Sequence, residues 1–312
     1  QTQQQNVEFQ VDVPEVSDHR EDFELPLGRI SGSVTGPGGE PAVGARVTLA
    51  PAGGFRSDAA FGGQYAEVET NAAGEYDLVA LRPGTYMIAS GGAPLLNAGG
   101  DAALGRVIED GIELSEGEWK KDVDLRLSGP GNIEVRVLGA DGQPARGASV
   151  FFRDSQGRVT EPFNFALTDS VGTFTGRGLG VGYYTVSARV GNVASLKSPV
   201  VRIAEGETAK VELRLEPGVI LWIKLKDREK QDIRASLQVL DEDGHDWGAM
   251  FGIEDLQLLY GEGGFSPTEH RLGPLPPGKY KVIARGEDGK KATKPVRIKA
   301  GESERRVTLR LK

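Results

Sequence analysis

The sequence contains no cysteine, and this absence limits the chemistry available to the chain. Without cysteine there is no disulfide framework, no thiol nucleophile and no thiolate metal site. The three histidines lack the spacing that places two zinc ligands on one helical face. Long hydrophobic runs are also missing, so the sequence predicts no membrane-spanning helix.

Sequence motifs of catalysis are missing as well. There is no Gly-x-Ser-x-Gly elbow and no Gly-x-x-x-x-Gly-Lys-Ser/Thr phosphate loop. We therefore expect a protein that is not an enzyme, with no catalytic residues and no cofactor.

Basic residues are too few and too dispersed to form a nucleic-acid interface, so we expect no nucleic-acid partner. The net charge of −8 conceals a gradient along the chain. Residues 1–127 carry 21 acidic and 9 basic side chains, residues 128–216 carry 9 and 10, and residues 217–312 carry 15 and 18. An acidic beginning and a mildly basic end attract each other, which favours head-to-tail self-association.

Glycine is abundant, at 44 of 312 residues, or about twice its average usage. These glycines lie between short runs of alternating apolar and polar residues, as the turns between β-strands require. The composition therefore predicts an all-β fold.

A Leu-x-x-Gly-x-Tyr motif occurs three times, beginning at Leu81, Leu179 and Leu275. Each copy is followed by a Gly-Glu turn and an alternating strand, and the period of roughly 90 to 100 residues is that of a small β-sandwich. We predict three tandem Ig-like, antiparallel β-sandwiches in an elongated rod, because the linkers are very short. The predicted segments are an N-terminal strand arm, 1–27, and three repeats, 28–127, 128–216 and 217–312, the last being the most diverged.

The order of motifs resembles a known domain family. Asn71–Tyr76 and Asp169–Phe174 each place Asn or Asp and then Gly before an aromatic strand residue. Together with the tyrosine motif, this order resembles the carboxypeptidase regulatory-like domain, a transthyretin-like β-sandwich found in tandem in bacterial surface and secreted proteins. The resemblance extends from about residue 28 to 216, and in 217–312 it rests mainly on Gly264-Phe265 and Leu275–Tyr280. It implies an extracellular or cell-surface location, and it specifies the fold rather than the function.

The last residue of the repeated motif is Tyr86, Tyr184 or Tyr280. We expect these tyrosines to be structural, with the ring in the core and the hydroxyl bonded to backbone near the turn, as in the tyrosine corner of sandwiches.

Two groups in the third repeat are candidates for ligand binding. Carboxylates crowded on a loop can bind Ca²⁺, which makes Asp241, Asp243 and Asp246 a weak metal candidate. They do not fit the usual calcium loop, and the alternative is a solvated turn. Trp247, Phe251 and Tyr260 are weak candidates for carbohydrate binding, with burial in the core as the alternative.

The N-terminal arm has the pattern of a strand with one apolar face, formed by Val7, Phe9, Val11 and Val13. A two-stranded ribbon is not stable alone in water, so this stripe needs a partner. Either it is an assembly interface that adds a strand to another subunit, or residues 1–27 are the stump of a further repeat in a longer chain.

These observations predict a non-catalytic extracellular structural protein, a rod or a subunit of a cell-surface fibre assembled head to tail through its N-terminal strand. Its partners are then other copies of itself or neighbouring domains of a larger chain. One alternative is an accessory module that binds carbohydrate or peptide. Another is a regulatory domain array of a secreted hydrolase.

Overall fold

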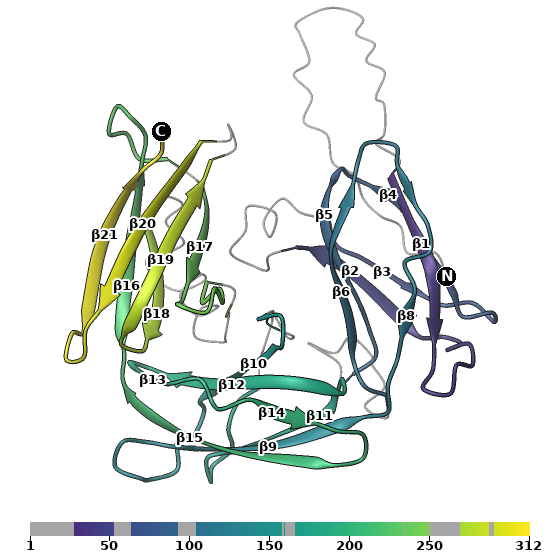
Figure 1. Ribbon diagram of the computed structural model, residues 1–312, viewed down its shortest axis with the longest axis horizontal. Helices are drawn as coiled ribbons and strands as arrows, with labels where there is room; N and C mark the ends of the chain where they lie inside the picture. The colour runs from purple at the N-terminus through teal and green to yellow at the C-terminus, as the bar shows by residue number, and fades with distance from the viewer. Residues whose placement is uncertain are drawn as a thin grey trace, which may run out of the picture. The chain divides into compact units, whose positions relative to one another are not determined.

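The computed structural model describes residues 28–52, 64–92, 104–157, 159, 166–233, 235–248, 250, 269–286 and 290–312. Every regular element within these ranges is a β-strand, which confirms the predicted all-β class (Figure 1). They contain no helix that could cross a membrane. The chain divides into two compact units: within the described ranges the first holds residues 28–52, 64–90 and 107–127, and the second holds residues 91–92, 104–106 and the described residues from 128 to 312.

The first unit contains two four-stranded sheets. One sheet has the order β4-β1-β7, with β8 also paired to β1, and the other has the order β3-β2-β5-β6. Alternation along the strands buries Ile30 and Val34 of β1 and Val47 and Leu49 of β2, which form the core. The strands are β1 (Gly28–Thr35), β2 (Arg46–Pro51), β3 (Ala66–Glu69), β4 (Glu75–Leu81), β5 (Gly84–Ser90), β6 (Val107–Leu114), β7 (Trp119–Lys120) and β8 (Leu125–Arg126).

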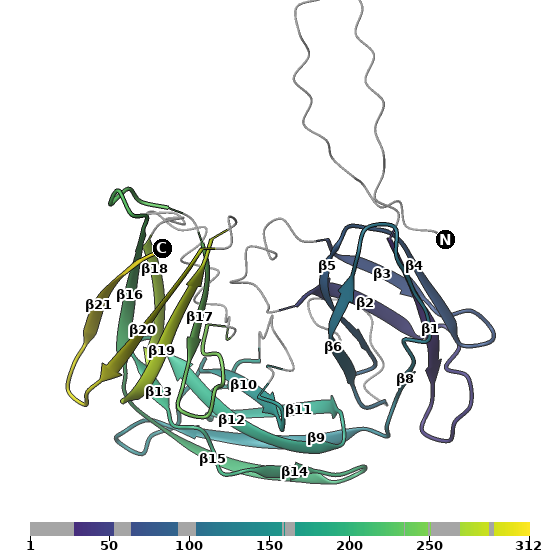
Figure 2. The ribbon, with the colours of Figure 1, turned by 45° about the horizontal axis from the view of Figure 1, so that its top comes forward.

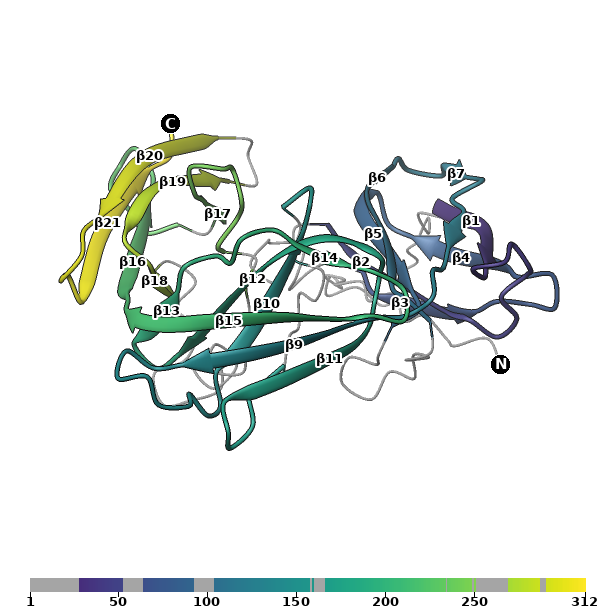
Figure 3. The ribbon, with the colours of Figure 1, turned by 60° about the horizontal axis from the view of Figure 1, so that its bottom comes forward.

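The second repeat lies in the second unit and forms one seven-stranded sheet that folds around its own core. The order is β10-β12-β13-β15-β9-β11, with β14 paired to β12, and Figure 3 shows β15, β9 and β11 side by side. The short β13 pairs with both β12 and β15, so it joins β10 and β12 on one side to β15, β9 and β11 on the other. The strands are β9 (Gly131–Leu138), β10 (Ser149–Asp154), β11 (Thr173–Leu179), β12 (Gly182–Val190), β13 (Val193–Ser195), β14 (Val201–Ile203) and β15 (Thr208–Pro217).

The third repeat has two three-stranded sheets, ordered β18-β16-β21 and β17-β19-β20 (Figure 2). Leu221, Ile223 and Leu225 of β16 share one buried cluster with Val282 and Ala284 of β19, so the two sheets pack face to face. The strands are β16 (Val219–Lys226), β17 (Ser236–Leu240), β18 (Glu269–Leu275), β19 (Gly278–Arg285), β20 (Lys291–Ile298) and β21 (Glu304–Arg310).

Most strand pairs of the described residues are antiparallel, as predicted, but each repeat also contains parallel pairing that the sequence analysis did not anticipate. The opening strand runs parallel to a closing strand: β1 to β7 and β8, β9 to β15, and β16 to β21. Between its opening and closing strands, the chain forms the other strands of the repeat. Parallel neighbours need such a crossover, whereas antiparallel neighbours can be joined by a tight turn.

The second and third repeats belong to the same compact unit. The clearest link is β10, in which Phe152 packs in the core of the second repeat and Phe151 packs in the core of the third. Successive side chains of a strand point to opposite faces, so one strand can supply both cores. The boundaries predicted for three separate domains, and the rod shape, stay predictions.

Candidate functional site

The last tyrosine of the repeated motif has the same surroundings in every repeat. Tyr86, Tyr184 and Tyr280 are 3, 8 and 5% exposed. Burial raises the pKa of Tyr86 and of Tyr280, so both hydroxyls stay protonated at neutral pH. Each hydroxyl donates a hydrogen bond to the backbone carbonyl four residues earlier, at 2.7, 2.8 and 2.8 Å from Arg82, Gly180 and Pro276.

Asp241, from the acidic cluster after β17, forms a turn with its own backbone. Its Oδ1 accepts hydrogen bonds from the backbone N–H groups of Asp243 and His245, at 3.0 and 2.9 Å. Asn71 and Asp169 accept the same pair of bonds in the turns before β4 and β11. Asx turns of this kind favour Asp or Asn, which accounts for Asp241 without a metal.

Lys197 lies among the carboxylates that the sequence analysis considered for calcium. Its Nζ is 2.9 Å from Asp241 Oδ2, 2.5 Å from Asp243 Oδ2 and 3.4 Å from His245 Nδ1. The third predicted ligand, Asp246, instead accepts backbone hydrogen bonds through Oδ1. The ammonium group therefore occupies the position a cation would take. Because Lys197 belongs to the second repeat, this ion pair connects the second and third repeats.

The electrostatics of this cluster keep the ion pair charged. Burial alone would raise the pKa of Asp241, but hydrogen bonds from Lys197, Trp247 and the backbone of His245 outweigh it and lower that pKa. Burial likewise opposes the charge of Lys197, yet the two carboxylates raise the pKa of Lys197. Burial and the charge of Lys197 lower the pKa of His245, which favours a neutral imidazole.

Trp247 belongs to the core of the third repeat and is only 4% exposed. Its ring meets that of Tyr280 edge to face, with centroids 6.2 Å apart and an angle of 86°. Its Nε1 donates a hydrogen bond to Asp241 Oδ2 at 2.9 Å. The indole therefore presents no open face to a sugar. The other two aromatic candidates, Phe251 and Tyr260, and the arm residues Val7, Phe9, Val11 and Val13 lie outside the described residues.

Arg153 of β10 extends from the second repeat into the third and is 1% exposed. Its Nη1 donates to the carbonyl of Asp246 at 3.0 Å, and its Nη2 lies 2.7 Å from Met250 Sδ. Its guanidinium carbon is 5.5 Å from the centroid of the Trp247 ring. Burial lowers the pKa of Arg153 to about 10, opposed by Asp241 and Asp246, so the side chain is still charged at neutral pH.

Arg189 of β12 also extends from the second repeat into the third and is 3% exposed. Its Nη1 donates to the carbonyl of Gly273 at 3.2 Å, and its Nη2 donates to the carbonyl of Met250 at 3.1 Å. Its guanidinium carbon lies 5.0 Å from the Phe151 ring centroid. We call the contacts of Phe151, Arg153, Arg189 and Lys197 with the third repeat the inter-repeat interface.

The inter-repeat interface was not predicted from the sequence, although one signal was present. The corresponding strand of the first repeat, Arg46–Pro51, alternates between partly buried and buried residues. Strand β10 instead has Phe151 next to Phe152 and is buried at five of its six positions. Two adjacent large apolar residues in a strand indicate that both of its faces are covered.

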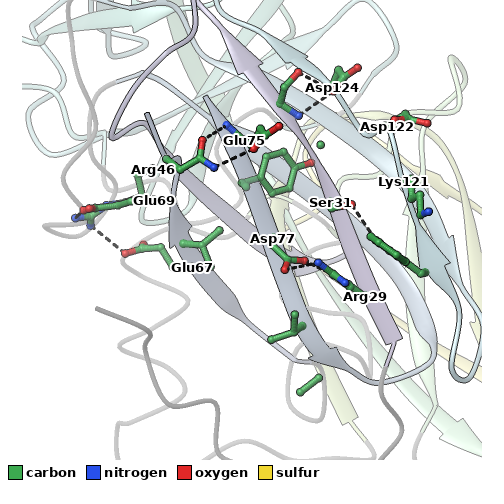
Figure 4. A pocket seen from close by; sticks show the side chains of 18 residues that line it. Arg29, Ser31, Arg46, Glu67, Glu69, Glu75, Asp77, Lys121, Asp122 and Asp124 are labelled. Atoms are coloured by element: carbon green, nitrogen blue, oxygen red, sulfur yellow. Dashed lines mark hydrogen bonds and ion pairs between the residues drawn. The ribbon is translucent and has the colours of Figure 1, made fainter. Parts of the chain in front are cut away.

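The first unit has an open groove of about 1450 Å³ on its surface (Figure 4). The indole of Trp119, which is 46% exposed, lies in its wall and donates a hydrogen bond from Nε1 to Ser31 Oγ at 2.9 Å. Arg29 and Lys121 lie over the ring, 4.0 and 3.9 Å from its centroid. Six carboxylates share the lining: Glu67, Glu69, Glu75, Asp77, Asp122 and Asp124. They come from distant parts of the sequence, so no local motif indicated this groove.

The comparisons with known proteins identify a domain family for part of the chain. Residues 132–216 match the carboxypeptidase regulatory-like domain, which confirms the resemblance for the second repeat. No curated protein matches the sequence.

Several solved structures of bacterial proteins resemble the chain distantly. The TIE protein of Bacillus anthracis is 17% identical, with a TM-score of 0.27, over 92% of this chain and 51% of that one, so this chain spans about half of its length. The minor pilin GBS52 of Streptococcus agalactiae is 15% identical over 61% of this chain and 96% of that one, with a TM-score of 0.27. The major pilin subunit BcpA of Bacillus cereus is 11% identical over 91% and 99%, with a TM-score of 0.21. Likenesses of this size carry no argument about function.

Proposed function

We propose that the chain is a non-catalytic structural protein of the cell surface, in which the second and third repeats act as one stiff unit. The observation that carries this proposal is the inter-repeat interface. Two buried arginines and a buried phenylalanine extend from the second repeat into the third. Strand β15 ends at Pro217 and β16 begins at Val219, so a single residue separates the repeats.

Bending between the second and third repeats would break the hydrogen bonds of Arg153 and Arg189. A guanidinium group offers five N–H donors in fixed directions, and hydrogen bonds weaken steeply when their angles change. Bending would also withdraw Phe151 from the core of the third repeat, where it is fully buried. Neighbouring domains usually move relative to each other unless their interface is extensive. A joint that resists bending suits a protein that holds a shape.

We further propose that the protein is extracellular and assembles head to tail through the N-terminal arm. The support is the alternating pattern of Val7, Phe9, Val11 and Val13 and the match of residues 132–216 to the carboxypeptidase regulatory-like domain, a resemblance that implies a surface or secreted protein. An unpaired strand with an apolar face associates readily with the edge of another sheet.

Deletion of residues 1–21 tests the role of the arm. If the arm is a donor strand, the shortened protein should be a folded monomer that forms no polymers in light scattering and electron microscopy. Circular dichroism of β type shows that the variant has folded. Assembly that continues unchanged after the deletion contradicts the role of the arm.

An accessory module that binds carbohydrate is the second candidate function, and the exposed indole of Trp119 favours it. A sugar ring stacking on this indole must displace Arg29 or Lys121, which lie over the ring. Titration with neutral oligosaccharides should then quench Trp119 fluorescence, and Trp119→Ala should abolish the binding. No response at millimolar sugar would exclude this function for the groove.

A further inference from the structure

The groove of the first unit, here called the acidic groove, carries an excess of negative charge. Its six carboxylates face three cations, Arg29, Arg46 and Lys121, which leaves a net charge of −3. Arg29 is already paired with Asp77 at 2.6 Å, and Arg46 with Glu67 at 3.2 Å and with Glu69 at 4.0 Å. Glu69 and Glu75 are exposed at the ends of β3 and β4, where a partner can reach them.

The aromatic wall of the acidic groove already holds cations of its own chain. The face of an indole attracts ammonium and guanidinium groups through its quadrupole. Arg29 and Lys121 lie over the Trp119 ring, 4.0 and 3.9 Å from its centroid, so the carboxylates rather than the indole attract a further cation. The carboxylates extend along the groove from β3 to the segment after β7, so the shape fits a row of cations rather than a single ion.

The third repeat carries such a row on the outer face of β19 and β20. Tyr280, Val282 and Ala284 of β19 point into the core, so alternation places Lys279, Lys281, Ile283 and Arg285 on the opposite face. Ile283 is covered there, at 8% exposed, whereas the three cations are exposed. Cross-strand partners share a face, which places the partners of these outward residues beside them on β20. The resulting basic face consists of Lys279, Lys281, Arg285, Lys291 and Arg297, all exposed.

The arrangement of the basic face does not stabilise the sheet. Lys279 lies directly opposite Arg297, and Arg285 lies directly opposite Lys291. Like charges opposite each other in neighbouring strands are destabilising. The adjacent outward residues of β17 are Ser236, Gln238 and Leu240, none of them a carboxylate, and Glu242, in the turn after β17, pairs with Lys279 at 3.0 Å. An acidic partner outside the sheet would relieve this repulsion.

We propose that the acidic groove of one copy binds the basic face of a second copy. This inference rests on the proposed function as an assembling structural subunit, and it adds the surfaces that meet. Groove and face differ, so the contact is heterologous, and each copy in a pair keeps one free groove and one free face. A heterologous contact that does not close continues into a chain of subunits. Opposite charges also speed the encounter and fix its register.

Two charge-reversal variants of the full chain test this contact. The groove variant carries Glu69→Lys and Glu75→Lys, and the face variant carries Lys281→Glu, Lys291→Glu and Arg297→Glu. All five side chains are exposed, so the fold should be retained. A control variant, Glu212→Lys with Glu216→Lys, makes the same change as the groove variant on the second repeat, where both side chains are also exposed.

Sedimentation velocity at about 20 mM salt, where charges act over roughly 20 to 30 Å, should show association that grows with concentration. The groove and face variants should each associate at least about tenfold more weakly, and the control variant should behave as wild type. Salt of about 0.5 M should dissociate the wild-type complexes. An equimolar mixture of the groove and face variants should form dimers and nothing longer, because it retains one intact groove and one intact face.

Wild-type protein that stays monomeric at low salt overturns the proposed contact. Association of both variants as strong as that of wild type also overturns the proposed contact. This second result does not contradict the proposed structural function. Loss of association only on deletion of residues 1–21, with both charge variants still assembling, would assign assembly to the arm alone. Unchanged assembly together with quenching of Trp119 by a neutral oligosaccharide would assign the groove to a sugar.

Discussion

At the scale of the residue, the repeated tyrosine shows how a short motif reports a packing requirement. The ring of Tyr184 fills the core of its repeat, and its hydroxyl satisfies the carbonyl of Gly180, which opens the same turn. The preceding residue, Tyr183, is 56% exposed. Adjacent tyrosines of opposite burial provide a matched pair for measuring the contribution of the corner.

Tyr184→Ala should destabilise the second unit by about 3–5 kcal/mol, as truncation of large core aromatics does. Tyr183→Ala should change the free energy of unfolding by less than about 0.5 kcal/mol. Tyr184→Phe, which removes only the hydroxyl, should cost about 1 kcal/mol. Urea unfolding measures all three. Equal effects of the two alanine substitutions would show that the tyrosine is not structural.

His245 should make the second unit less stable as the pH falls. Its pKa in the folded protein lies below the ordinary value of 6.5, so the unfolded chain binds the proton more readily. The stability that neutral His245 contributes is therefore fully present above about pH 6.5 and is lost as the pH falls below that value. His245→Gln should reduce the loss of melting temperature between pH 7.5 and pH 5.5. A variant with the same pH dependence as wild type would contradict this role.

At the scale of the element, alternation identified the strands because it is a local property. The run Ile133–Val137 lies within β9, and Ile220–Leu225 lies within β16. The parallel pairing of β9 with β15 escaped prediction because it joins residues about 75 positions apart, and strand periodicity does not specify a partner. The burial of Arg153 and Arg189 was not predicted either, since an arginine in a strand normally indicates a solvent-exposed face.

Strand β10 gives a direct measure of how far the two repeats depend on each other. Phe151 belongs to the second repeat by sequence, yet it is fully buried in the core of the third. Phe151→Ala should therefore destabilise the third repeat by about 3–5 kcal/mol. The transition should be followed by the fluorescence of Trp247, which lies in that core. An unchanged Trp247 transition would show that the inter-repeat interface contributes nothing.

At the scale of the whole molecule, the sequence indicated the repeats but not their grouping into units. Three copies of the tyrosine motif predict three sandwiches, whereas the structure divides the chain into two compact units. The charge gradient was visible in the sequence. Its concentration in the acidic groove and the basic face was not, because residues such as Glu69 and Asp124 meet only after folding.

The central claim is that the second and third repeats behave as one unit, and the second repeat itself contains no tryptophan. A background with Trp119→Phe and Trp222→Phe leaves Trp247 as the reporter of the third repeat. Ile133→Ala then removes a fully buried side chain from the core of the second repeat, at a cost of about 2–5 kcal/mol. Ile30→Ala, equally buried in the first unit, is the control.

Thermal unfolding of these variants, followed by Trp247 fluorescence, is the measurement that tests the claim most directly. The account predicts that Ile133→Ala lowers the midpoint reported by Trp247, because the repeats unfold together, and that Ile30→Ala leaves it unchanged. If Ile133→Ala leaves the unfolding midpoint reported by Trp247 unchanged, the third repeat unfolds by itself, which would contradict the account.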